Sequence, residues 1–128
     1  MEELHEDQKA VLQSKIASNQ IILERLDGNE LGNVTSILSQ TKSLSLVDCS
    51  VYYFSSKLKA TLLTGDSALR KFAENKKLEV RGILWIFDEF QAKGLVNGTM
   101  LAEKLQFLTT INTRLPKTEC EKRIELWK

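Results

Sequence analysis

Apolar residues recur at helical spacing through most of this 128-residue chain. The spacing predicts helices over residues 2–17, 30–40 and 41–60, and the third carries the broadest apolar stripe. Gly32 and Thr35 weaken the second of these helices. The same pattern predicts four later helices, over residues 66–77, 83–94, 97–111 and 115–128.

Three short runs of β-branched residues and leucine interrupt the helices and predict strands at residues 21–26, 61–64 and 78–82. The run "TLLT" at 61–64 is apolar on both faces, which is typical of a central parallel strand. Helices that alternate with short buried strands predict an α/β fold with a parallel sheet. The helices of residues 81–128 have no strands between them, so we expect them to pack as an additional helical layer.

The length predicts one domain over residues 1–128, and the composition is that of an ordinary globular protein. A formal net charge of +1 gives no overall electrostatic argument for a nucleic-acid partner. A local basic patch remains open, because six cations flank the expected end of the sheet and could either contact phosphates or form solvated helix faces. They are Lys57, Lys59, Arg70, Lys71, Lys76 and Lys77.

The first ten residues are acidic and polar, and no apolar run approaches the ~20 residues that a membrane helix needs. We therefore expect a cytoplasmic protein without membrane contact, in which Cys49 and Cys120 are reduced core thiols. The single histidine, His5, has no His or Cys partner at ligand spacing, which argues against structural zinc.

Two aspartates stand where an α/β sheet binds ligands, beyond the carboxyl ends of its strands. Asp66 follows "TLLT", and Asp48 lies near the start of the preceding helix. Converging carboxylates bind Mg²⁺ or Mn²⁺, which prefer hard oxygen ligands. Both residues also fit helix capping, Asp66 as an N-cap and Asp48 in an S-x-x-D capping box with Ser45. Spacing alone leaves both roles open and favours capping.

Residues 44–90, from "LSLVDCSVYYF" through "TLLTGDSALRKFAE" to "GILWIFDEF", resemble the C-terminal half of a PIN domain, the fold of VapC-like toxins and related nucleases. Residues 111–127, "INTRLPKTECEKRIELW", resemble the tail of one subgroup of these proteins. The resemblance implies a PIN-like parallel sheet flanked by helices, with extra C-terminal helices.

The resemblance also implies a ribonuclease site in which several acids hold Mg²⁺ or Mn²⁺. Asp48 and Asp66 match the two acids of the C-terminal half, and Thr64 matches the supporting hydroxyl beside the last aspartate. Glu3 matches the glutamate of an earlier helix, with Glu2 as the alternative register.

One part of the family pattern is missing, because PIN domains begin with a central strand that ends in an aspartate and this chain starts beyond it. We therefore expect either an N-terminally shortened member of the family or a start that lies inside a longer reading frame, and in both cases nuclease activity that is weak or absent. The alternative is a non-catalytic module that dimerises or binds a partner on the same fold. The partners implied are RNA, an antitoxin-like protein and a second copy of the chain, since the strand at 61–64 would otherwise keep an open edge.

The aromatic residues Trp85, Phe87 and Phe90 lie in an almost wholly apolar run. This context favours a place in the core or in a dimer interface over a role as platforms for base stacking.

Overall fold

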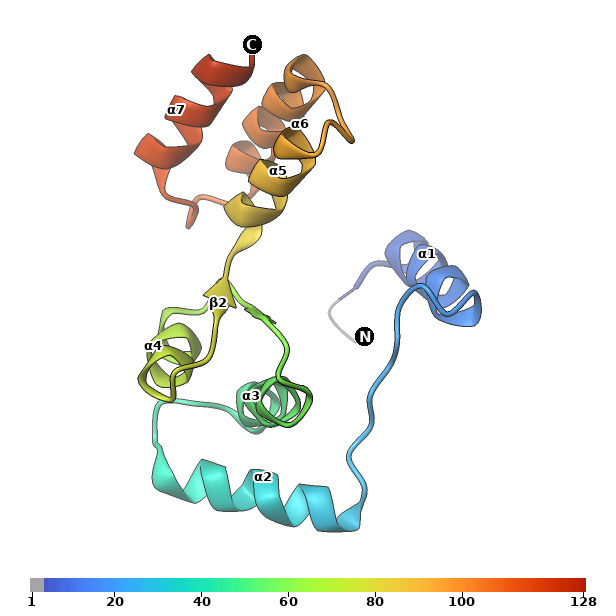
Figure 1. Cartoon of the computed structure of the whole chain (residues 1–128), viewed down its shortest axis with the longest axis vertical. Helices are drawn as coiled ribbons and strands as arrows, with labels where there is room; N and C mark the ends of the chain where they lie inside the picture. Colours follow the sequence, from blue (N-terminus) through green and yellow to red (C-terminus); the bar gives the residue numbers. More distant parts are fainter. Residues whose placement is uncertain (1–3) are drawn as a thin grey trace. The chain divides into compact units, whose positions relative to one another are not determined.

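The computed structural model describes residues 4–128 of the chain. These residues form two compact units, Met1–Leu58 and Lys59–Lys128, and each is described by itself. Figure 1 shows the helices and strands in chain order. Within residues 4–128, no helix combines the length and the apolar character that crossing a membrane requires.

The first unit contains three helices, α1 (Glu6–Ala17), α2 (Gly28–Gln40) and α3 (Leu46–Leu58). α2 packs on α3, and Val34 and Cys49 are fully buried, one on each of these helices. Lys57 donates a 2.9 Å hydrogen bond from Nζ to Glu30 Oε2, which ties α3 to α2. This bond lowers the pKa of Glu30, because it stabilises the charged carboxylate. All three helices were predicted from the apolar spacing.

The prediction of a strand at residues 21–26 is wrong. These residues join α1 to α2 without pairing with any described strand. Ile22 is 77% exposed, and Ile21 and Leu23 are also exposed. A run of β-branched residues forms a strand only where a neighbouring strand pairs with its backbone and other residues cover its side chains. Residues 21–26 have no paired strand among the described residues, and most of their apolar side chains are exposed.

The second unit begins with two short parallel strands, β1 (Leu62–Leu63) and β2 (Val80–Arg81), connected by α4 (Ser67–Asn75). Leu62 lies opposite Val80, and both side chains are buried. α4 packs against β2 and buries Leu69 and Ala73. The predicted parallel pairing is therefore confirmed, in a fold that is mainly helical with a small parallel sheet.

The rest of the second unit is a helical layer of α5 (Ile83–Ala92), α6 (Gly98–Ile111) and α7 (Lys117–Trp127). α6 packs along α7, and α5 packs on α6 (Figure 1). The core of this layer consists of buried residues of α6 and α7. They are Leu101, Ala102, Leu105, Cys120, Ile124 and Trp127.

Three contacts fix this helical layer. Phe87 of α5 stacks on Trp127 with ring centroids 6.4 Å apart. Arg123 donates two hydrogen bonds to Asp88, of 2.7 and 2.8 Å, and they join α7 to α5. A Cβ atom at Gly98 would lie only 2.7 Å from the carbonyl oxygen of Trp127, so α6 begins directly against the end of α7.

Both cysteines are free and buried, as the sequence predicted. Burial raises the pKa of the Cys49 thiol and of the Cys120 thiol, because it disfavours the thiolate. Their role is that of small core residues.

α4 and α5 end with the same pair of backbone hydrogen bonds. After α4, the amides of Lys77 and Leu78 donate to Glu74 and Ala73, and after α5 the amides of Gly94 and Leu95 donate to Gln91 and Phe90. This is the Schellman motif, which needs a left-handed residue at its turn. Gly94 takes that place after α5 with φ +64°, as the sequence predicted, and Lys77 takes it after α4 with φ 64°.

The two helix ends generate a stability prediction. Lys77→Gly should raise the free energy of unfolding by up to about 1 kcal/mol, because glycine adopts the left-handed backbone conformation without the steric cost that a Cβ atom adds. Gly94→Ala should lower it by about 1 kcal/mol for the same reason. Denaturant unfolding followed by circular dichroism measures both.

Gly32→Ala serves as the control for these substitutions, because Gly32 lies inside α2 with open space around its Cα. Replacing it should stabilise the helix by about 1 kcal/mol. A loss of stability in Lys77→Gly would contradict the assignment of strain to this turn.

Candidate functional site

The candidate site is built on the carboxyl ends of β1 and β2. The amide of Leu62 donates to the carbonyl of Glu79 at 2.9 Å, and the amide of Thr64 donates to the carbonyl of Arg81 at 3.0 Å. These bonds align the two strands so that they end side by side. The chain that leaves β1, Thr64–Gly65–Asp66, therefore lies next to the chain that leaves β2 at Gly82.

Asp66 is the residue at which the turn after β1 becomes helix α4. Its Oδ2 accepts a 2.8 Å hydrogen bond from the amide of Leu69, so it is the N-cap that the sequence predicted. The amide of Asp66 donates to the Thr64 hydroxyl at 3.0 Å. The Thr64 side chain thus holds the backbone of Asp66. Asp66 is exposed, and its Oδ1 accepts no hydrogen bond from residues 4–128.

Asp48 lies in the first turn of α3, in the first unit. Its Oδ2 accepts from the amide of Ser45 at 3.1 Å, and its own amide donates to Ser45 Oγ at 3.1 Å. The predicted capping box is confirmed. The side chain of Asp48 is half-buried, and one carboxylate oxygen takes no part in the box.

Capping does not prevent either aspartate from binding a cation. Each carboxylate uses one oxygen to cap a helix and keeps the second oxygen available, and carboxylate oxygens are the ligands that Mg²⁺ and Mn²⁺ prefer. The donor chemistry therefore fits a divalent ion.

The remaining predicted ligand, Glu3, lies outside the described residues, as does its alternative Glu2. In the described part of either unit, no three side chains of His, Cys, Asp or Glu gather closely enough to hold a metal ion. Asp48 belongs to the first unit and Asp66 to the second. The joint site of these three acids remains a prediction.

The predicted basic patch separates into cations with different surroundings. Lys57 is paired with Glu30, and Lys76 lies over the ring of Phe72, 5.7 Å from its centroid. Arg70 lies at the strand ends, because a Cβ atom at Gly82 would be only 3.2 Å from Arg70 Nη2.

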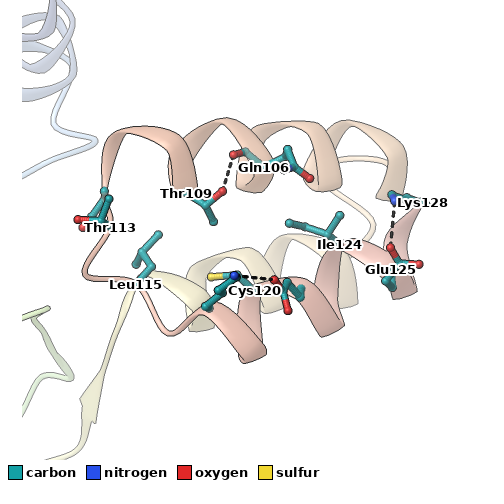
Figure 2. A pocket seen from close by; sticks show the side chains of 11 residues that line it. Gln106, Thr109, Thr113, Leu115, Cys120, Ile124, Glu125 and Lys128 are labelled. Atoms are coloured by element: carbon teal, nitrogen blue, oxygen red, sulfur yellow. Dashed lines mark hydrogen bonds and ion pairs between the residues drawn. The ribbon is translucent and has the colours of Figure 1, made fainter.

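The cavities of the second unit include one between α6 and α7 and one at the strand ends. The first, of about 650 Å³, lies between α6 and α7 and has Thr109, Cys120 and Ile124 in its lining (Figure 2). An ion pair between Lys128 and Glu125 lies at one end of it (Figure 2). Cys120, Glu121 and Glu125 in its lining do not form a group that could hold a metal ion.

The second cavity, of about 760 Å³, lies at the strand ends, and we name it the Gly82 cavity. Its lining comes from the turn after β1, the start of α4, the start of α5 and the loop between α6 and α7. Its polar and aromatic side chains are those of Thr64, Arg70, Trp85, Asn112 and Arg114, and Gly65 and Gly82 line it with backbone.

Arg114 was not among the residues singled out in the sequence. It lies in a loop some fifty residues beyond Thr64, and no local pattern connects the two. The only local signal is its place two residues before Pro116, in a loop that precedes a helix.

A family model described as a PIN domain matches residues 1–128 of the chain. No curated protein and no solved structure gave a match. The family match agrees with the resemblance seen in the sequence and covers both units.

The N-cap of α4 generates the second prediction. Asp66→Ala should lower the free energy of unfolding by about 1 kcal/mol, because the amide of Leu69 loses its acceptor. Asp66→Asn should cost much less, since asparagine caps helices about as well as aspartate. Denaturant unfolding of the two variants measures the difference.

Asn97→Ala is a matched control, because Asn97 caps α6 through a 2.8 Å bond from the amide of Met100 and carries no charge. Its cost should equal that of Asp66→Ala. If Asp66→Asn proves as costly as Asp66→Ala, the negative charge rather than the cap bond stabilises this turn.

Proposed function

Because the chain belongs to the PIN-domain family, we propose that it is a nuclease-type domain that cleaves RNA phosphodiester bonds with Mg²⁺ or Mn²⁺. In this proposal Asp66 and Asp48 bind the ion together with Glu3. The observation that carries the proposal is the position of Asp66, at the end of a parallel strand with one carboxylate oxygen unengaged.

The chemistry follows from these residue types. When bound at such carboxylates, a divalent ion would lower the pKa of a water and offset the negative charge that develops on a phosphate. The chain's own contribution is to present the oxygens. The cap bond to Leu69 limits the rotation of the Asp66 carboxylate, and the Thr64 hydroxyl holds the backbone of the turn. A water-activating site needs such fixed ligands, because small misplacements slow the reaction strongly.

We further propose that the activity of this 128-residue chain is weak. Asp48 and Asp66 each lack two further acids nearby within the described part of their own unit. Mg²⁺ needs near-ideal octahedral geometry, so carboxylates that are not accurately placed bind it weakly and misplace the attacking water.

A cleavage assay tests this function. The purified chain should cut single-stranded RNA slowly in Mg²⁺ or Mn²⁺ and not at all in EDTA. Asp66→Asn should abolish the reaction while the helix cap is kept, and Glu103→Gln, an exposed acid on α6, should leave it unchanged. Gel analysis of labelled RNA gives the rates.

Three outcomes of this assay separate the role of Asp66, the proposed weak activity and the nuclease function itself. Cleavage that survives in Asp66→Asn would contradict the role of the aspartate. Fast cleavage that Asp66→Asn abolishes would contradict only the proposed weak activity. No cleavage by the wild type would contradict the nuclease and favour the second candidate function.

The second candidate is a non-catalytic module that dimerises or binds an antitoxin-like protein. The observation in its favour is the small sheet, since β1 and β2 pair only with each other among residues 4–128. Leu63 is 48% exposed on this sheet. Open strand edges are sites where a second chain adds its own strand.

Sedimentation at micromolar concentration tests the self-association. A homodimer is expected, and Leu63→Lys should shift it towards monomer because a charge at the edge opposes pairing. A wild-type protein that sediments as a monomer over this range would contradict the dimer.

A further inference from the structure

We propose that the Gly82 cavity binds one nucleotide of single-stranded RNA next to the scissile bond, with Arg70 and Arg114 on the phosphate and Trp85 against the base. This inference rests on the proposed nuclease function. Arg70 was one of the six cations expected to contact phosphates or form solvated helix faces, Trp85 was expected in the core or a dimer interface, and Arg114 was not predicted.

The lining of the cavity is positively charged. It contains two arginines and no carboxylate. Guanidinium groups bind phosphate oxygens through two parallel hydrogen bonds, which makes arginine the common phosphate ligand. Such a lining favours an anion over a cation.

The two arginines are also available for a ligand. In the described residues Arg114 forms no ion pair, and only its backbone amide is engaged, in a 3.1 Å bond to Asn112 Oδ1. Arg70 has one ion pair, 3.5 Å to Glu74, between side chains that are both well exposed. Such a pair adds little stability and yields to a phosphate. Arg123 shows the contrast, since its two bonds to Asp88 commit it to the fold.

The backbone around Gly82 is shaped for a close approach. Because Gly82 has no Cβ, the Arg70 guanidinium lies against the chain at the end of β2. Gly82 is also the N-cap of α5 and offers no side-chain cap, so no side chain at this cap competes with a ligand for the first amides of the helix. These amides supplement the two arginines as donors.

The remaining lining supplies an apolar surface beside the charge. Trp85 is half-buried, and Leu84, Leu115 and Pro116 extend the apolar wall. An indole ring that remains partly accessible stacks on nucleobases without regard to sequence. A volume of about 760 Å³ lies in the range of small-molecule sites and holds a nucleotide.

The location connects the cavity to the proposed chemistry. Thr64 and Gly65 line it, and Asp66 is the next residue in the chain. If one RNA nucleotide binds in this cavity, the neighbouring phosphodiester lies beside the Asp66 carboxylate that we propose as a metal ligand. The ligand class is therefore single-stranded RNA rather than a free metabolite.

The test measures binding in EDTA, where no cleavage occurs, so that its result is independent of catalysis. Fluorescence anisotropy of a labelled ten-nucleotide single-stranded RNA is recorded over a range of salt concentrations. Arg70→Gln and Arg114→Gln should each weaken binding and reduce the slope of log affinity against log salt by about 0.7. Trp85→Leu should weaken binding roughly tenfold at an unchanged slope.

Lys104→Gln is the matched control, because Lys104 is an exposed α6 residue outside the cavity lining and the substitution removes its positive charge. Its affinity should stay within about twofold of the wild type. Circular dichroism and the thermal midpoint of each variant show that the fold is kept. A nucleoside 5′-monophosphate should displace the RNA at lower concentration than inorganic phosphate does.

The results separate this inference from the nuclease proposal. Binding that is equal in the wild type and in all three cavity variants, or no binding at all, would overturn the RNA site. Equal displacement by phosphate and by the nucleotide would overturn the contact with the base. Cavity-dependent binding in a chain that shows no cleavage would support the site and contradict only the nuclease.

Discussion

The parallel pairing of β1 with β2 is the constraint on which the site depends. Two backbone hydrogen bonds and the buried pair Leu62 and Val80 hold the strands in one register. This register brings the turn that contains Asp66 next to Gly82, although the two residues are sixteen positions apart in sequence. A shift by one residue would turn Leu62 to the opposite face and separate the two turns.

Helix capping and the proposed metal binding use the same aspartates, and they do not compete. Asp66 and Asp48 each cap a helix with one oxygen. The cap bond fixes the carboxylate, so its second oxygen is presented without a further loss of rotamer entropy. An asparagine keeps the cap and loses the charge, which explains why asparagine variants separate the two roles and alanine variants do not.

Much of the fold was readable from the sequence because its signals are local. Apolar spacing located all seven helices of the described residues, Gly94 marked the end of α5, and Ser45 with Asp48 marked the start of α3. The strand at residues 21–26 failed because strand formation depends on a partner elsewhere in the chain. The Gly82 cavity could not be predicted, since Arg114 and Thr64 lie fifty positions apart in the sequence and line one cavity only in the folded unit.

The central proposal is that Asp48 and Asp66 share one divalent ion, and paramagnetic broadening by Mn²⁺ tests it most directly. In a titration of ¹⁵N-labelled protein, the amides of Leu46–Cys49 and of Gly65–Leu69 should broaden together at the same Mn²⁺ concentration. Asp66→Asn should remove both effects. Broadening of one segment alone, or of Leu46–Cys49 unchanged in Asp66→Asn, would contradict a shared ion.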